Sequence, residues 1–159
     1  EDFVAVKVSA EEIDRLLTET NLNKLEIDRM QTIINVLKPD RVIIDSPEVN
    51  TKNFSAKIRS GLDNKNVHLI CENYADKNYV EVSAASIIAK IERDREITAL
   101  HKKYGHFGSG YPSDEITIRF LKDWIKKNKE FPSFVRKSWA TTQRLLTEKQ
   151  QTNLKRFGK

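Results

Sequence analysis

The stretch that decides the fold is RVIIDSP, residues 41–47. Its central apolar run is short and bounded by charged residues, which predicts a buried β-strand, and Ser46-Pro47 predicts a turn or a helix start at the carboxyl end of that strand. Residues 67–71 form a second run of the same kind, and a helix ending near Gly61 separates the two runs. Strands that alternate with helices indicate an α/β architecture in which at least part of the sheet is parallel.

Helical patterns and one more strand pattern lie on either side of this unit. Residues 3–8 alternate in a way that predicts a strand, and Ser9 and Glu12 have the spacing of a capping box that starts a helix. Apolar residues at helical intervals predict a second helix that residues 38–40 end. Two helices are expected near the carboxyl end, the first carrying Ile118, Leu121, Trp124 and Ile125 and the second carrying Val135, Trp139 and Leu146.

The best-defined helix is expected over residues 83–103. Five side chains cluster on one side of its helical wheel, and Asp94 falls at the edge of that stripe. The stripe therefore predicts a core-facing surface with one carboxylate turned toward its margin. Its members are Ala84, Ile87, Ile88, Ile91 and Thr98.

Composition limits the class of protein. The 159 residues are 38% hydrophobic, which suits one domain with a core of its own. The longest apolar runs are too short to span a bilayer and no signal peptide is recognisable, so we expect a soluble, cytoplasmic protein. Cys71 is the single cysteine, which excludes an intrachain disulfide and a cysteine-rich zinc site.

The net charge of +5 is unevenly distributed along the chain. Residues 1–100 carry a net charge of −4, whereas residues 101–159 carry +9. A concentrated positive region attracts phosphate backbones, so nucleic acid is a candidate partner, and a solvated basic surface is the alternative reading. Lys102, Arg136 and Lys137 are the candidates for phosphate contacts.

Two carboxylates could take part in metal chemistry. Asp45 ends an apolar strand, and ligands bind outside the carboxyl ends of strands in open α/β sheets. Together with Asp94 it could supply part of an oxygen-rich site for Mg²⁺ or Mn²⁺. The alternatives remain open: Asp45 as the residue that turns the chain before Pro47, and Asp94 as a partner of a neighbouring arginine.

A glycine-rich loop follows the long helix. Three of the five glycines fall within residues 105–110, which predicts a tight loop, and the spacing does not match a phosphate-binding P-loop. Tyr111 comes directly after it and suits stacking on a base or a sugar, although a packing role is equally open. The three histidines, His68, His101 and His106, lack metal-ligand spacing, so structural roles are favoured for each.

Four ordered motifs resemble ribonuclease HII of the archaeal type. They are VIIDSP at residues 42–47, Ala75-Asp76-Lys77, VSAASIIAKIERD at residues 82–94 and GSGYPSD at residues 108–114. The resemblance implies an RNase H-like fold, a mixed sheet flanked by helices, with residues 1–146 as the catalytic domain and residues 147–159 as a tail. It also implies a monomer that acts in replication and repair.

The resemblance further implies an endonuclease that hydrolyses the RNA strand of RNA–DNA hybrids and cuts at ribonucleotides embedded in duplex DNA. Asp45 and Asp94 match two of the family's four metal-binding carboxylates, and a two-metal mechanism with Mg²⁺ or Mn²⁺ would leave a 5′ phosphate and a 3′ hydroxyl. Tyr111 matches the tyrosine that packs against the sugar at the RNA–DNA junction. Ser83, Ser86 and Lys90 lie near the matching active-site helix.

One family feature has no match in residues 1–159. Family members begin with a strand that carries an Asp-Glu pair, followed by a glycine-rich segment that grips the ribonucleotide, whereas this sequence begins at Glu1 in the region of the third strand. We therefore expect no cleavage and low stability from residues 1–159 alone. The alternative function is a non-catalytic fragment that binds hybrid nucleic acid or the clamp, and a third is a basic α/β nucleic-acid-binding domain without a metal.

The last residues resemble the motif with which replication proteins dock on the sliding clamp, PCNA. Gln151, Leu154 and Phe157 have the order glutamine, aliphatic, aromatic, and Leu154 and Phe157 would form an apolar pair on one helical turn. The second aromatic residue of the motif is replaced by Gly158. The resemblance implies a clamp-binding tail, and a frayed basic terminus is the alternative.

Overall fold

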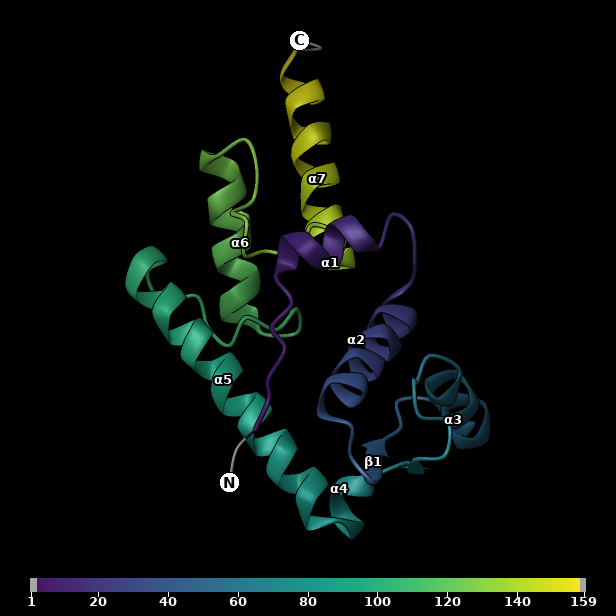
Figure 1. The fold of residues 1–159 in the computed structure, drawn as a ribbon. Coiled ribbons are helices and arrows are strands. Elements are labelled where there is room, and N and C mark those ends of the chain that lie inside the picture. Colours follow the sequence, from purple (N-terminus) through teal and green to yellow (C-terminus); the bar gives the residue numbers. More distant parts are fainter. Residues whose placement is uncertain (1–2, 158–159) are drawn as a thin grey trace. The chain divides into compact units, whose positions relative to one another are not determined.

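The computed structural model describes residues 3–157 and the side chains of residues 3–151. The elements are shown in Figure 1. In chain order they are α1 (Ala10–Leu16), α2 (Leu22–Leu37), β1 (Arg41–Asp45), α3 (Thr51–Ser60), β2 (His68–Glu72), α4 (Ala75–Asn78), α5 (Val80–Tyr104), α6 (Glu115–Lys127) and α7 (Ala140–Phe157). Among the described residues, no helix combines the length and the apolar character needed to cross a bilayer.

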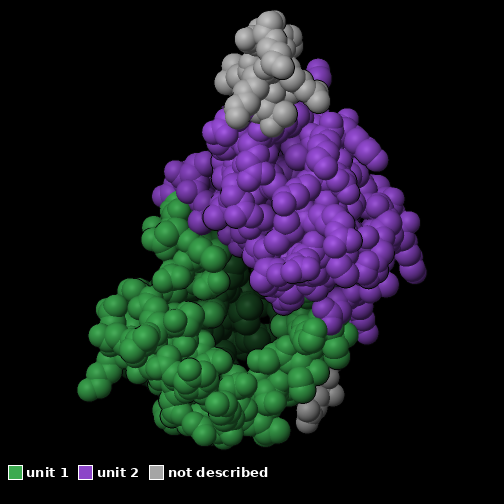
Figure 2. Space-filling view, turned by 180° about the vertical axis from the view of Figure 1, so that it is seen from behind, with its two compact units in different colours: residues 1–7, 20–93 green, residues 8–19, 94–159 purple. Residues whose placement is uncertain are grey.

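The chain divides into two compact units, coloured separately in Figure 2. The first unit contains residues 1–7 and 20–93, and the second contains residues 8–19 and 94–159. The long helix α5 contributes to both units, because the division falls between Arg93 and Asp94.

The first unit contains a two-stranded parallel sheet. β1 and β2 pair in register from Arg41 opposite His68 to Asp45 opposite Glu72, which confirms both predicted strands. Parallel strands need a crossover connection, and α3 supplies it between them. α3 packs against β2 and α2, and α4 packs against β1. The prediction of an α/β architecture is confirmed.

The core of the first unit lies between the sheet and helices α2 and α3. Phe54 and Ile58 are 1% and 0% exposed, so each contributes about 2 to 3 kcal/mol through burial of its side chain. The other buried members are Ile27, Ile34, Val42, Leu62 and Val67. Leu69 and Cys71 of β2 pack against this cluster, so two helices and both strands share one apolar core, and this core holds the strands whose ends are described below.

Local sequence signals explain where the helices begin and end. Asn50 starts α3 by accepting a hydrogen bond from the backbone N–H of Asn53 (3.0 Å), and Gly61 ends it. α2 ends at Lys38, which adopts a left-handed conformation (φ 47°) immediately before Pro39. Ser9 accepts from the backbone N–H of Glu12 (3.1 Å) at the start of α1, as the predicted cap requires.

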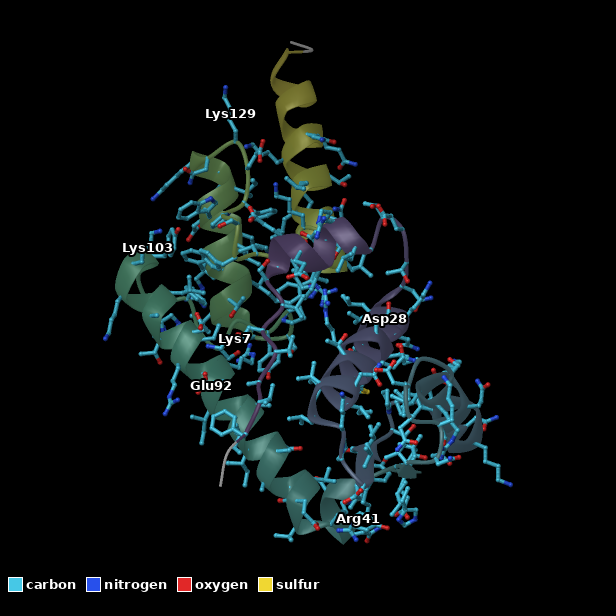
Figure 3. All side chains as sticks on the ribbon, viewed as in Figure 1. Lys7, Asp28, Arg41, Glu92, Lys103 and Lys129 are labelled. Carbon is cyan, nitrogen blue, oxygen red and sulfur yellow. The ribbon has the colours of Figure 1, made fainter. Side chains whose placement is uncertain are left out.

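Two ion pairs of the first unit involve residues labelled in Figure 3. Lys7 pairs with Glu92 (3.1 Å), and Arg41 pairs with Glu81 (2.8 Å). The first pair holds the amino-terminal segment against α5. The Arg41 pair connects the start of β1 to the first turn of α5, and both of its side chains are more than half exposed, so it adds little stability.

The core of the second unit lies between α6, α7 and the segment that joins them. Its buried members are Leu121, Ile125, Phe131, Val135 and Leu145. α1 joins this unit through Asp14, whose carboxylate accepts from the backbone N–H groups of Lys137 (2.6 Å) and Ser138 (3.1 Å). Desolvation raises the pKa of Asp14, but these hydrogen bonds and the charge of Arg136 outweigh it, so the pKa lies below its ordinary value.

Three expectations about secondary structure and packing are wrong. Residues 3–8 do not form a strand, because in the described structure they have no strand beside them to complete the hydrogen bonds. Val135 and Trp139 precede α7 instead of lying in a helix. Ile87 and Ile91 are 58% and 46% exposed, so the stripe on α5 does not face a core. The periodicity of a helix shows which residues share a face, and it does not show what covers that face.

The boundary expected after residue 146 falls inside α7, which continues without interruption to Phe157. The division into a catalytic domain and a tail therefore does not coincide with the end of a helix, and it stays a prediction.

Candidate active site

The carboxyl ends of β1 and β2 form one edge of the parallel sheet. Asp45 and Glu72 are register partners at the last position of these strands, so two carboxylates stand side by side where ligands bind in open α/β sheets. We call Asp45, Glu72 and the adjoining helix α4 the strand-edge region. Glu72 was not singled out from the sequence, although it shows the same signal as Asp45: an acidic residue that ends a short apolar strand.

Asp45 is exposed and has a partner on α4. Its Oδ1 accepts a hydrogen bond from the backbone N–H of Ala75 (3.3 Å). The turn after β1 is made by its neighbour Ser46, whose side chain is buried and whose Oγ bonds the backbone of Glu48 at 2.9 and 3.3 Å. Because Ser46 holds the turn, the carboxylate of Asp45 is left facing α4.

Glu72 is held from the other side by residues of the α4–α5 junction. The phenol of Tyr79 donates to its Oε1 (3.0 Å) and the side-chain amide of Asn78 donates to its Oε2 (3.2 Å). The hydrogen bond to this carboxylate raises the pKa of Tyr79, and desolvation and the charge of Glu72 act in the same direction. These bonds fix α4 close to the end of β2.

This arrangement places a third acidic residue in the strand-edge region. Asp76 follows Ala75 directly in the first turn of α4, and its side chain is exposed. The sequence motif around it was noted, but no role was assigned to it. The signal that identifies it is structural: the N–H of its neighbour Ala75 is bonded to Asp45.

Asp94 lies far along α5 from the α4–α5 junction. It is exposed on α5, fourteen residues after Val80, or roughly 21 Å along the helix axis. It belongs to the second unit, whereas Asp45 belongs to the first. The expectation that its carboxylate lies at the margin of a core is wrong, because the stripe beside it is exposed.

The donor set of the strand-edge region suits a hard cation only in part. Asp45 and Asp76 offer exposed carboxylate oxygens, the ligand type that Mg²⁺ and Mn²⁺ prefer. No group of three or more histidine, cysteine or acidic side chains with metal-site geometry occurs among the residues that the structure describes. These two carboxylates can therefore supply part of a coordination shell, with water and substrate oxygens completing it.

The expected substrate-binding residues are distributed over both units. Ser83, Ser86 and Lys90 lie on the part of α5 that belongs to the first unit, and their spacing places them on one helix face. Lys102, Tyr111, Arg136 and Lys137 belong to the second unit.

Two of the basic candidates have partners within the protein. The guanidinium of Arg136 lies 5.6 Å from the centre of the Trp139 ring, and its Nε is a buried donor for which the described residues offer no acceptor. Lys137 pairs with Glu130 (3.3 Å) on the surface. Exposed pairs of this kind are weak, so Lys137 can exchange its partner for a phosphate at small cost.

The glycine-rich loop is tight, as predicted. Gly105, Gly108 and Gly110 have φ values of 83°, 81° and 74°. His101 holds the loop through a hydrogen bond between its Nε2 and the carbonyl of Gly108 (2.9 Å). Its ring contacts the ring of His106 at a tilt and that of Phe107 edge to face, so these histidines have packing contacts. Tyr111 is half exposed at the end of the loop.

Comparison with known proteins identifies the family. The family model for ribonuclease HII matches residues 2–142. A ribonuclease HII of Methanothrix thermoacetophila is 43% identical over 146 residues, which cover 91% of this chain and 68% of that protein. A ribonuclease HII of Thermococcus sibiricus is 40% identical and is matched over 100% of this chain and 72% of its own length.

Two solved structures support the same assignment. The ribonuclease H2 of Pyrococcus horikoshii superimposes with a TM-score of 0.81 at 40% identity, over 89% of this chain and 66% of that chain. The ribonuclease HII of Archaeoglobus fulgidus, solved in complex with PCNA, gives 0.77 at 40% identity, over 84% and 64%.

The chain spans about two thirds of the length of these relatives. Its α/β fold, its ordered motifs and the match across nearly all of its residues agree with one another. The chain belongs to the ribonuclease HII family, a family of ribonuclease H enzymes.

Proposed function

We propose that this protein is an endonuclease that hydrolyses the RNA strand of RNA–DNA hybrids and cuts at single ribonucleotides in duplex DNA. Membership of the ribonuclease HII family over residues 2–142 supports the proposal. The single observation that carries it is the hydrogen bond from the Ala75 N–H to Asp45, because it holds α4, the helix that carries the exposed Asp76, against the exposed Asp45 at the carboxyl edge of a parallel sheet, where ligands bind in open α/β sheets.

Asp45 and Asp76 are the residues proposed to hold the divalent cation. A bound Mg²⁺ or Mn²⁺ ion would activate a water molecule and stabilise the leaving 3′ oxygen, which gives a 5′ phosphate and a 3′ hydroxyl. Glu72 keeps α4 in place through Tyr79 and Asn78, so it supports the site without needing to bind the ion. Asp94, which the sequence motifs favoured, becomes the alternative second ligand.

Recognition of the substrate is assigned to the remaining candidates. The half-exposed ring of Tyr111 suits packing against a sugar, and the 2′ hydroxyl is the group that distinguishes a ribonucleotide from its deoxy counterpart. Ser83, Ser86 and Lys90 provide hydroxyl and ammonium donors on one face of α5. Lys102, Arg136 and Lys137 provide positive charge for the phosphate backbone.

A cleavage assay tests the proposal. The substrates are a duplex with one ribonucleotide and the matched all-DNA duplex, each with Mg²⁺, with Mn²⁺ and with EDTA. The family resemblance implies further metal-binding carboxylates on an Asp-Glu strand. The assay therefore has two arms: residues 1–159 alone, and residues 1–159 mixed with a peptide that carries this strand from a relative. The proposal predicts cutting at the ribonucleotide in the second arm. Equal cutting of both duplexes would contradict it.

The non-catalytic alternative has one observation in its favour, since the described residues contain no cluster of three metal-ligating side chains. It predicts that the protein binds a ribonucleotide-containing duplex in both arms and cuts in neither. Binding measured by fluorescence anisotropy beside the cleavage assay separates the two functions.

The carboxyl end is proposed to bind the sliding clamp. The solved complex of the Archaeoglobus fulgidus relative with PCNA supports this assignment. Gln151 is exposed on α7, and the side chains of Leu154 and Phe157 lie outside the described residues. Calorimetry of a peptide of residues 147–159 against PCNA, compared with the peptide carrying Leu154→Ala and Phe157→Ala, tests the tail. Equal binding by both peptides would exclude it.

A further inference from the structure

The loop that carries Tyr111 is held by one carboxylate. Asp114 precedes α6, and its Oδ2 accepts from both the backbone N–H (2.5 Å) and the Oγ (2.8 Å) of Ser109. Its Oδ1 accepts from the backbone N–H of Ile116 (3.0 Å), which is the ordinary bond of a helix N-cap. A single side chain therefore caps α6 with one oxygen and binds the loop with the other.

Thr117 extends this network into the core. Its Oγ1 accepts from the backbone N–H of Gly110 (3.0 Å) and lies 2.8 Å from the carbonyl of Phe107 and 3.1 Å from Asp114 Oδ2. The hydroxyl has one proton, so it donates to one of these two oxygens at a time. Thr117 is buried, and its contacts link both the start and the middle of the loop to α6.

The backbone of the loop is shaped to admit the carboxylate. Gly108 is buried with φ +81°, and a Cβ atom at this position would collide with the carboxylate of Asp114. A side chain at Gly108 would therefore be strained by the backbone conformation and excluded by contact. The close approach of the loop to the carboxylate therefore depends on having glycine at position 108 and aspartate at position 114 of the segment GSGYPSD.

These contacts fix Tyr111 from both sides. Its backbone N–H donates to the Oγ of Ser109 (3.4 Å), and its carbonyl accepts from the backbone N–H of Asp114 (3.1 Å). The ring remains half exposed. The carbonyl bond joins the backbones of the two residues, whereas the carboxylate of Asp114 reaches Tyr111 through the hydroxyl of Ser109.

We propose that Asp114 is a positioning residue for substrate recognition: it orients Tyr111 toward the sugar of the ribonucleotide and so contributes to the preference for ribonucleotide-containing duplexes. The inference rests on the proposed function. The number of bonds supports it, because a helix cap requires only the bond to Ile116, whereas the bonds of Oδ2 serve the loop.

The experiment uses variants that retain the cap. Serine and asparagine both cap helices well, so Asp114→Ser and Asp114→Asn keep the start of α6 but lose the pair of oxygens that binds both Ile116 and the loop. Asp123→Asn is the matched control, because it removes an exposed carboxylate of α6 that, in the described part of the chain, is bonded only to Lys126. Ser109→Ala, which deletes the hydroxyl bonds to Asp114 and to the backbone N–H of Tyr111, serves if the Asp114 variants fail to fold.

The first readout is hydrogen exchange of the free protein, which does not depend on function. The amides of Ser109 and Gly110 should exchange at least about tenfold faster in Asp114→Ser than in the wild type, since a lost hydrogen bond of about 1.4 kcal/mol corresponds to a factor of ten. Asp123→Asn should leave them unchanged. Unchanged exchange in Asp114→Ser and in Asp114→Asn would overturn the inference.

The second readout is the ratio of dissociation constants for the all-DNA duplex and the duplex with one ribonucleotide, measured by anisotropy in Ca²⁺. We expect this ratio to fall at least about fivefold in Asp114→Ser and about twofold in Ser109→Ala. In a Tyr111→Ala background the Asp114 substitution should change it by less than about twofold, because coupled residues are non-additive.

The outcomes separate the two proposals. A wild-type ratio of one contradicts the proposed function, and the inference falls with it. Two results contradict the inference alone and leave the proposed function standing. In one, Asp114→Ser leaves the wild-type preference unchanged. In the other, Asp114→Ser lowers the preference by the same factor in the wild type and in Tyr111→Ala.

Discussion

The strand-edge region and the glycine-rich loop each depend on one acidic residue, Asp45 and Asp114. The two carboxylates differ in how many hydrogen bonds they accept from the protein. Asp45 is exposed, and among the described residues its carboxylate accepts a hydrogen bond only from the Ala75 N–H, at 3.3 Å. Asp114 accepts from Ser109 and Ile116 at 2.5 to 3.0 Å, and its Oδ2 lies 3.1 Å from the hydroxyl of Thr117. One carboxylate is left available for a ligand, whereas the other is used by the protein itself.

The difference follows from what each region has to do. A group that binds a cation must keep oxygen atoms open, because every hydrogen bond to the protein competes with the ion. A loop that recognises a sugar gains from being ordered in advance, since the entropy of ordering is then not lost on binding. We therefore expect substitutions at the strand edge to affect chemistry, and substitutions at the loop to affect selectivity.

The largest effect is expected for Asp45→Asn. The amide retains the shape of the side chain but loses the charge that attracts a cation, so cleavage should fall at least about 100-fold. The rate is measured in the more active arm of the cleavage assay. Asp123→Asn, an exposed change outside both regions, is the control. Retained cleavage by Asp45→Asn would remove the strand edge from the chemistry.

Asp76→Asn and Asp94→Asn decide which residue accompanies Asp45. Since α4 is bonded to Asp45, whereas Asp94 follows the start of α5 by fourteen residues, the loss of cleavage for Asp76→Asn should exceed that for Asp94→Asn by at least about tenfold. Both rates are measured over a series of Mn²⁺ concentrations. A larger loss for Asp94→Asn would restore the assignment made from the sequence motifs.

Tyr79→Phe should have a smaller effect on the strand edge. It deletes the hydrogen bond to Glu72 and keeps the ring, and one such bond contributes about 0.5 to 1.5 kcal/mol. Cleavage should fall roughly two- to tenfold, with a matching rise in the Mg²⁺ concentration needed for half the maximal rate. A lower melting temperature with an unchanged Mg²⁺ dependence would show that the bond serves stability alone.

Acidification should have the smallest effect on the glycine-rich loop. The backbone bond from Ser109 lowers the pKa of Asp114 below its ordinary value of 3.8, and the Ser109 hydroxyl bond adds to the shift. A lowered folded-state pKa gives a contribution that is complete above the unfolded value and is lost as the pH falls through the folded value. The Ser109 amide signal in NMR should therefore stay constant from pH 7 to about pH 4. A titration midpoint of this signal above pH 3.8 would contradict the account that hydrogen bonds from the loop stabilise the charged carboxylate of Asp114.

Much of the fold could be predicted because its signals are local. The two strands are short apolar runs bounded by polar residues, Pro39 follows the end of α2, and Gly61 ends α3. The strand expected over residues 3–8 was wrong because a strand needs a neighbour, and alternation in one segment does not supply one. The expectation that the stripe on α5 faces a core was wrong for a related reason, since packing depends on residues far apart in the sequence.

The candidate site likewise combines residues that local sequence signals identify with residues that depend on contacts between distant parts of the sequence. Asp45 could be identified from its place at the end of a strand, and Glu72 could have been identified in the same way. Asp76 could not be given a role from periodicity, because its relation to Asp45 depends on a hydrogen bond across thirty residues. The helical wheel placed Asp94 on a face of α5 but contained no information about its distance from the sheet.

The most direct test of the central claim is the location of the metal ion. Crystals of the protein soaked in Mn²⁺ should show an anomalous peak at about 2.1 Å from carboxylate oxygens of Asp45 and Asp76, the distance typical of a small hard cation. Asp45→Asn crystals soaked in the same way should lose the peak. An ion bound at Asp94, with none at Asp45, would contradict the assignment of the strand edge as the active site.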